Sequence, residues 1–289
     1  MRRLKLYFNL FRYWQWIKNL IIFIPIILSN TYDLNLLIDT LGLFILFSIF
    51  VSGTYIFNDI KDYKEDQKHP KKRGRPIASG AISLKNAFLT SLVLTITSIS
   101  FSFFYYGSKI AILFIYYLLL TLFYSFKLKY INVADGIIVS LLYFIRLYLG
   151  SEITKVELTF ELSAYIILLS MIIVFLKKNS ILNTPNYSNK IKELIILQNK
   201  SVQNIVLIKT LSVFLHLVLG WWAAKFIETS FDLLLIFLFI ILHLLLIRNL
   251  INLSNEGLLE DLSKSIITNY KLVFKILILI IIFLMFYNV

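Results

Sequence analysis

Three aspartates at helical spacing are the residues in this chain best suited to chemistry. Asp59, Asp62 and Asp66 are separated by three and then four positions, and Asn58 precedes them. On a helix these positions share one face, where three unpaired carboxylates repel one another. Because a hard divalent cation prefers oxygen ligands, the spacing predicts a cation site, to which Asn58 adds a neutral oxygen.

Magnesium bound to a diphosphate is the cation that suits this motif best. Mg²⁺ keeps several waters and usually takes one or two carboxylates together with phosphate oxygens. Bound there, Mg²⁺ would neutralise the charge that develops on a leaving pyrophosphate. The alternative is a solvated helix end, in which the aspartates pair with nearby lysines: Lys61, Lys64 and Lys68.

A basic run follows the aspartates within a few residues. Its four cations are Lys71, Lys72, Arg73 and Arg75. Arginine offers a planar fork for bidentate contact with phosphate, so the run is a candidate site for further phosphate groups. Pro76 and Gly80 bracket a predicted turn that would fold the run back over the aspartates. Alternatively, the run keeps its loop in the cytoplasm or binds anionic lipid head groups.

The rest of the chain is strongly apolar. It has 289 residues, of which 59% are hydrophobic, and a mean hydropathy of +0.81, whereas a soluble domain is about 45–50% apolar. Apolar runs of about twenty residues recur, which predicts an all-α membrane bundle of about nine spans in a single domain, residues 1–289. The predicted spans are 14–28, 36–57, 84–105, 110–124, 133–150, 162–176, 205–226, 231–247 and 270–286.

We attribute the net charge of +13 to basic residues that hold loops in the cytoplasm. We predict no binding to nucleic acid. Lysine and arginine concentrate in alternate connectors, which places the N-terminus and the aspartates in the cytoplasm. We therefore expect an integral protein of the cell membrane with a cytoplasm-facing site. The chain has no cysteine, which excludes disulfides and thiolate chemistry. No cleaved signal peptide is predicted.

Other polar residues in apolar surroundings are weaker candidates. Asp135 and Arg146 are eleven positions apart and so share a helix face, where they either anchor the bundle or line its cavity. Lys18 either snorkels to the interface or reaches a phosphate. His216 and His243 lie singly in apolar helices and are interpreted as hydrogen-bonded bundle residues. The remaining candidate substrate-binding residues are Tyr124, Lys127, Lys177 and Lys178.

The motifs together carry a resemblance. The aspartate stretch reads NDxxDxxxD, preceded by Arg12-Tyr13-Trp14-Gln15-Trp16-Ile17-Lys18-Asn19 and extended by His69-Pro70-x-Lys72-Arg73-x-Arg75-Pro76-Ile77-Ala78-x-Gly80. Tyr124-Ser125-x-x-Leu128-Lys129 follows later. Through these residues the chain resembles the UbiA superfamily of intramembrane prenyltransferases, and more narrowly its decaprenyl-phosphate phosphoribosyltransferase branch. The resemblance covers roughly the first 150 residues well and the later chain in topology.

The resemblance implies a donor, an acceptor and a set of roles. The donor would be phosphoribosyl pyrophosphate and the acceptor a polyprenyl phosphate, with the lipid tail among the apolar helices. Mg²⁺ on the aspartate motif would hold the pyrophosphate, and the basic run would clamp the sugar's 5-phosphate or the acceptor. The expected partners are thus a polyprenyl lipid, a diphosphate donor and the bilayer, with a second copy of the chain as a further candidate.

The chain departs from the family after the predicted sixth span. It has no Asp between Asp135 and Asp232, where many UbiA prenyltransferases carry a second aspartate motif. The phosphoribosyl branch shows a Gly-Lys-Arg-like signature there, of which this chain keeps only the basic pair in Leu176-Lys177-Lys178-Asn179. Two alternatives stay open: a prenyltransferase that acts on an aromatic or other acceptor, and a lipid or ion transporter whose aspartates bind a cation.

Overall fold

The computed structural model describes residues 2–29, 33–69, 72–126, 133–183 and 201–259, positions 261, 263 and 265, and residues 268–287. These residues form helices and turns, with no β-strand among them. They divide into two compact units. The first comprises Met1–Lys129 and Ile145–Glu157, and the second comprises Tyr130–Phe144 and Leu158–Val289.

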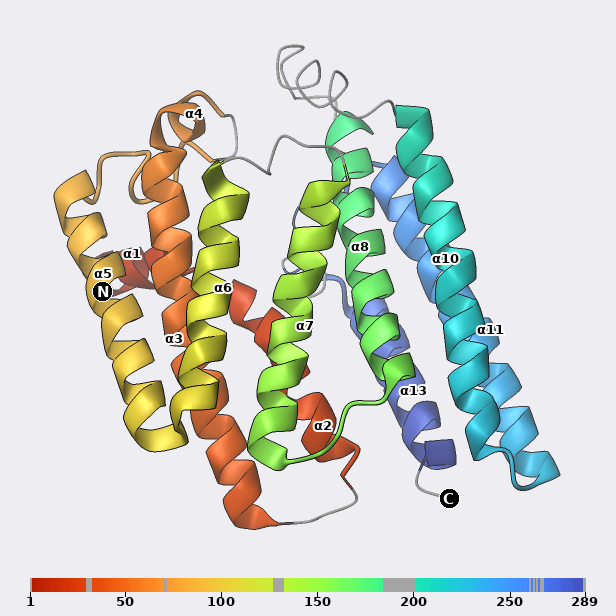
Figure 1. The fold of residues 1–289 in the computed structure, drawn as a ribbon. Helices are drawn as coiled ribbons and strands as arrows, with labels where there is room; N and C mark the ends of the chain where they lie inside the picture. The colour runs from red at the N-terminus through yellow and green to blue at the C-terminus, as the bar shows by residue number, and fades with distance from the viewer. Residues whose placement is uncertain are drawn as a thin grey trace. The chain divides into compact units, whose positions relative to one another are not determined.

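The first unit is built on three long helices that pack side by side (Figure 1). Its elements are α1 (Arg2–Phe11), the 3₁₀ helix η1 (Tyr13–Phe23), α2 (Ile24–Ile27), α3 (Leu34–Lys61), α4 (Tyr63–Lys68), α5 (Leu84–Phe101), the π-helical turn η2 (Ser102–Tyr106), α6 (Ser108–Phe126) and the second half of α7 (Ala134–Thr154). Polar caps fix where two of them begin, because Asp33 accepts from Asn35 N and Ser83 accepts from Asn86 N. Gly107, with φ of 91°, separates η2 from α6.

Aromatic side chains fill the core between α3 and α6. Phe50 and Phe114 pack edge to face with ring centroids 4.7 Å apart, and Phe47 lies 5.1 Å from Tyr117. Edge-to-face packing adds to the stabilisation from burial. Gly150 of α7 lies so close to η1 that an added Cβ would be 2.1 Å from Ile22 O, so this contact requires a glycine.

The second unit contains the first half of α7, α8 (Phe160–Asn183), α10 (Ser201–Ala223), the short η4 (Ala224–Phe226), α11 (Ser230–Asn255) and α13 (Tyr270–Tyr287). A capping box formed by Thr229 and Asp232 begins α11. Helix α8 packs against α10 and α11 (Figure 1). Phe175 of α8, Leu215 of α10 and Leu272 of α13 belong to one buried cluster.

The helices of the structure are those of an integral membrane protein, as the sequence predicted. Among the described residues, seven helices are long and apolar enough to cross a membrane: α3, α5 with η2, α6, α7, α8, α10 with η4, and α11. The other two predicted spans are also helical, as the shorter Tyr13–Ile27 and as α13. That all nine segments cross the bilayer stays a prediction, as does the orientation of the chain.

Two helices run well past the predicted ends of their spans. The sixth span was expected to end at Leu176 and the eighth at Ile247, but α8 continues to Asn183 and α11 to Asn255. Lys177 and Lys178 therefore lie in a helix and not in a connector. Polar contacts stabilise the last two turns of α8: Asn179 Nδ2 donates to Ser254 Oγ (2.9 Å) and Ser180 Oγ accepts from Leu259 N (2.8 Å).

Candidate functional site

Two of the three motif aspartates meet at one guanidinium in the first unit. Arg75 Nη1 lies 2.9 Å from Asp59 Oδ1 and 2.6 Å from Asp66 Oδ2. Both aspartates are buried, with 5% and 2% of their surface exposed. Two buried carboxylates require positive charge beside them, and Arg75 supplies it to both.

A break in the helix lies between the two aspartates. The aspartates were predicted to share a face of one helix, but α3 ends at Lys61 and α4 begins at Tyr63, with Asp62 capping the junction at ψ of 4°. Asp66 is still held by the turn, because its N–H donates to Asp62 O at 2.8 Å. Asp59 and Asp66 thus converge, while the half-buried Asp62 lies at the junction.

The basic run folds back over the aspartates, as the sequence predicted. Arg75 N donates to Lys72 O (2.9 Å), and Ser79 N donates to Arg75 O (2.9 Å). Gly80, with φ of 76°, closes the turn. Lys72 Nζ lies 3.8 Å from Asp66 Oδ1, whereas Arg73 is exposed. Lys71 lies outside the described residues.

Arg12 completes the cluster, and sequence reasoning gave it no role. Its Nε donates to Asp59 Oδ2 at 3.1 Å and its Nη2 donates to Asp59 Oδ1, a bidentate contact across 47 positions. Its backbone is left-handed, with φ of 51°, which is costly for a residue with a Cβ. The signal that pointed to Arg12 was its place beside the tryptophans of the N-terminal motif. We call Asp59, Asp66, Arg12 and Arg75 the aspartate–arginine cluster.

The end of α3 is tied to the end of α6. Asn58 Oδ1 accepts from Ser125 Oγ, and Lys61 Nζ donates to Ser125 O. Tyr124, beside Ser125, and Lys18, in η1, are both half-buried. Lys127 lies outside the described residues.

Arg146 is an internal anchor of the first unit. It is 3% exposed, and its Nε donates to Asn19 Oδ1 (2.8 Å) and its Nη2 to Tyr117 OH (2.7 Å). The guanidinium also lies 5.0 Å from the centre of the Tyr117 ring, a cation–π arrangement. Of the two roles considered for Arg146, these contacts favour the anchor.

Asp135 pairs with Lys178 in the second unit. Lys178 Nζ lies 2.6 Å from Asp135 Oδ2 and 5.1 Å from the centre of the Phe175 ring. Gly136 N also donates to the same carboxylate, at 2.8 Å. Of the basic pair at 177 and 178, Lys178 is therefore committed to an internal ion pair.

Lys178→Met should lower the free energy of unfolding by about 3–5 kcal/mol, because it leaves the buried Asp135 carboxylate without its cation. Thermal unfolding in detergent measures the loss. Adding Asp135→Asn to that variant should restore much of the stability, and Lys177→Met is the matched control. A Lys178→Met protein as stable as the native chain would contradict the ion pair.

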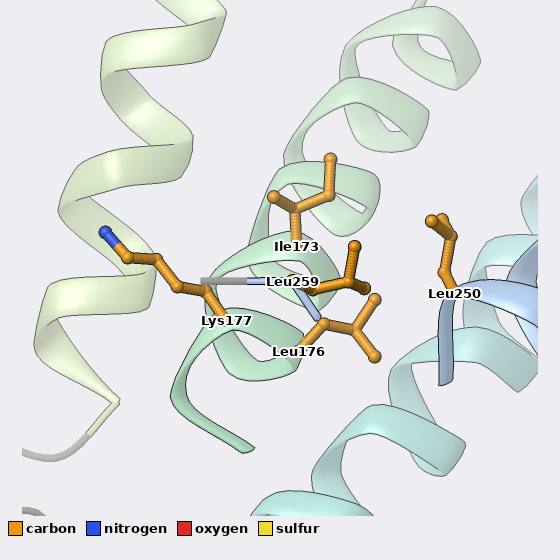
Figure 2. Close-up of a pocket in the computed structure, with 5 residues that line it drawn as sticks. All are labelled: Ile173, Leu176, Lys177, Leu250 and Leu259. Atoms are coloured by element: carbon orange, nitrogen blue, oxygen red, sulfur yellow. The ribbon is translucent and has the colours of Figure 1, made fainter. Parts of the chain in front are cut away.

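Lys177 lies at a small apolar pocket in the second unit. The pocket is lined by Ile173, Leu176, Lys177, Leu250 and Leu259. Figure 2 shows the aliphatic side chains gathered together, while the Lys177 amine points away from them. Lys177 thus lies at the edge of the pocket, and its side chain is directed away from the aliphatic residues.

The two histidines, expected singly, form one chain of hydrogen bonds. His243 Nδ1 lies 3.0 Å from His216 Nε2, and His243 Nε2 lies 2.9 Å from Tyr165 OH. His216 Nδ1 lies 2.6 Å from Ser212 O. Because a carbonyl only accepts, neutral rings fix one direction: Tyr165 donates to His243, His243 to His216, and His216 to Ser212 O. The expectation that they are hydrogen-bonded bundle residues holds, but they are partners of each other.

His243→Leu should cost about 1–3 kcal/mol of stability, because His216 and Tyr165 would each lose a buried partner. The measurement is thermal unfolding of the single variants and of His216→Leu/His243→Leu. The double variant should lose less than the two single losses added together, by roughly 0.6 kcal/mol. Strict additivity would show that the two rings do not interact.

The oxygen atoms of the aspartate motif are suitable ligands for Mg²⁺. Its carboxylates and the Asn58 amide offer hard oxygen ligands, and Asp59 and Asp66 already converge on one positive charge, that of Arg75. Within the described ranges, no three His, Asp or Glu side chains are arranged as a metal site. The structure thus brings two carboxylates together and leaves Asp62 at the helix junction.

The sequence is similar to the profile of a known family and to individual known proteins. The sequence profile of the UbiA prenyltransferase family matches residues 20–250. A decaprenyl-phosphate phosphoribosyltransferase of Mycobacterium tuberculosis is 33% identical over 150 residues, which make up 50% of this chain and 49% of that protein. The uncharacterized protein y4nM of Sinorhizobium fredii is 38% identical over 137 residues, or 47% of this chain and 26% of that protein. The chain thus matches about half or less of the length of these relatives.

The fold has solved counterparts. The structure of a UbiA homolog from Archaeoglobus fulgidus bound to GPP and Mg²⁺ superposes with a TM-score of 0.66 at 17% identity, covering 90% of this chain and 97% of that one. At this identity the likeness concerns the fold alone.

Proposed function

This chain belongs to the UbiA prenyltransferase family, and we propose that it is a magnesium-dependent intramembrane transferase. It moves a 5-phosphoribosyl group from phosphoribosyl pyrophosphate to a polyprenyl phosphate and releases pyrophosphate. The observation that carries the proposal is the aspartate–arginine cluster, in which two buried carboxylates and two guanidinium groups alternate.

Carboxylates and cations in one place suit a metal-bound diphosphate. Asp59, Asp62 and Asp66, with Asn58, would hold Mg²⁺, which when bound supplies positive charge to the departing pyrophosphate. Arg75 and Lys72 lie beside the same carboxylates, so they would lie next to the phosphate oxygens of a diphosphate held there through Mg²⁺. Arg12 holds Asp59 in place through both carboxylate oxygens.

The reaction requires that the enzyme position the two substrates and stabilise the charge that develops, and it needs no covalent intermediate with the enzyme. An oxygen of the lipid phosphate forms a bond to the anomeric carbon of the ribose, and the bond from that carbon to pyrophosphate breaks. The ribose carries positive charge as the bond breaks, and pyrophosphate gains negative charge. Preorganised cations that meet this developing charge lower the barrier. We propose that the basic run serves this role and also holds the 5-phosphate.

Two sequence features favour a phosphoribosyl donor over a prenyl diphosphate. The relatives named decaprenyl-phosphate phosphoribosyltransferases are 30–33% identical to this chain over about half of its length. Asp is absent from 136–231, so a second aspartate motif for a second metal is missing from the sequence. Transfer of a prenyl group from its diphosphate to an aromatic or other acceptor is the second candidate, because it is the activity for which the family is named.

An assay on membranes that contain the protein distinguishes phosphoribosyl transfer from prenyl transfer. They are incubated with Mg²⁺, polyprenyl phosphate and labelled phosphoribosyl pyrophosphate, and in parallel with a labelled prenyl diphosphate and an aromatic acceptor. We expect label from the sugar donor in the lipid extract. Consumption of the prenyl diphosphate without lipid-soluble sugar label would reverse the assignment. Flux of lipid or ions with neither donor consumed would indicate the transporter.

A further inference from the structure

Helix α1 presents aromatic side chains away from the protein. On one side Leu6, Leu10 and Phe11 pack against a buried cluster that includes Ile56 and Ala87. Beyond this contact Tyr7 and Phe8 are 47% and 50% exposed, and Tyr13, directly after the helix, is 52% exposed.

The packing places α1 at the ends of the long helices. Ile56 lies near the end of α3 and Ala87 near the beginning of α5. The same region holds Asp59, which pairs with Arg12 directly after α1. The helix thus lies where predicted spans leave the bilayer, the depth at which tyrosine and tryptophan are enriched in membrane proteins.

All charged residues of α1 are basic. The helix contains Arg2, Arg3 and Lys5, and no Asp or Glu occurs in the chain before Asp33. The same short helix carries the exposed Tyr7 and Phe8. A helix that combines basic residues with exposed aromatic residues is suited to lie in the plane of a membrane interface.

We propose that α1 is an interfacial helix that docks on anionic phospholipid head groups of the bilayer. Tyr7 and Phe8 enter the boundary between head groups and acyl chains, and the three cations of α1 attract the lipid phosphates. Each such cation near an anionic surface gives roughly a fivefold gain in binding. This surface is distinct from the proposed transfer reaction, although Arg12 joins it to the cluster.

The absence of cysteine allows a direct test with the full chain. Phe8→Cys carries one fluorescent label, and the protein is placed in nanodiscs of phosphatidylcholine and phosphatidylglycerol in equal parts. The acyl chains of one lipid or the other are brominated, so that quenching reports which lipid lies beside position 8. Val93→Cys, at an exposed position of α5, is the control for a lipid-facing site outside α1.

We expect brominated phosphatidylglycerol to quench the label at position 8 about twofold more than brominated phosphatidylcholine. The ratio should fall to about one in Arg2→Gln/Arg3→Gln/Lys5→Gln and remain unchanged in Lys85→Gln. The label at position 93 should not distinguish the lipids. If the triple variant does not fold, added salt should weaken the preference in the native sequence.

Three results would overturn the proposal. Quenching by neither lipid would place α1 in water or under another protein. Equal quenching in the native sequence would remove the anionic preference, and a preference that survives both the triple substitution and salt would show that these cations do not cause it.

Discussion

Asp62→Asn should lower the rate of transfer by about 10²–10³-fold and leave the melting temperature close to that of the native chain. Asp62 is half-buried at the junction of α3 and α4, where water screens its charge and limits what that charge contributes to stability. In the proposed site the same charge is needed for Mg²⁺. The measurements are initial rates at saturating Mg²⁺ and thermal unfolding of the same preparation.

Two neighbouring carboxylates serve as controls for Asp62. Glu65→Gln removes an exposed charge three positions further along the chain and should change neither rate nor stability. Asp59→Asn should lower both, because Arg12 and Arg75 would lose a buried partner. An Asp62→Asn enzyme with near-native activity would show that the metal assignment is wrong.

Arg75→Ala should destabilise the protein by about 3 kcal/mol, the lower end for a broken buried ion pair, when metal is absent. Asp66 would keep only Lys72, at 3.8 Å, and Asp59 would keep only Arg12. Mg²⁺ should reverse part of this loss, since a cation bound between the two aspartates replaces the missing charge. Added Mg²⁺ should therefore raise the melting temperature of Arg75→Ala more than that of the native chain. Thermal unfolding with EDTA and with Mg²⁺ measures the difference.

Arg73→Ala is the matched control for Arg75, because Arg73 belongs to the same basic run but is exposed. It should not alter the response to Mg²⁺. Equal stabilisation of Arg75→Ala and the native chain by Mg²⁺ would show that the metal does not bind between the two aspartates.

Local features of the fold and site could be predicted from the sequence. Hydropathy identified the segments that are helical, because the hydropathy of a segment depends only on the residues within it. The turn between Pro76 and Gly80 was also predicted, since proline and glycine restrict the backbone locally. The break at Asp62 was missed because the spacing of the aspartates is compatible with a continuous helix.

Partners that are distant in sequence could not be predicted. Arg12 reaches Asp59 across 47 positions, Lys178 reaches Asp135 across 43, and His243 reaches His216 across 27. Each pairing depends on how helices pack, and a periodic apolar pattern does not specify which polar residues face each other. Lys178 illustrates the consequence, because its ion pair with Asp135 could not be read from the sequence, while its predicted role in substrate binding stays a prediction.

A doubly labelled donor tests the central claim most directly. Phosphoribosyl pyrophosphate is labelled with one isotope in the ribose and another in the β-phosphate of its pyrophosphate, and is incubated with the purified protein, Mg²⁺ and polyprenyl phosphate. We predict that the ribose label enters the lipid phase while an equal amount of the phosphate label appears in water as pyrophosphate. Both labels remaining together in the aqueous donor, under conditions in which a prenyl diphosphate is consumed, would contradict phosphoribosyl transfer.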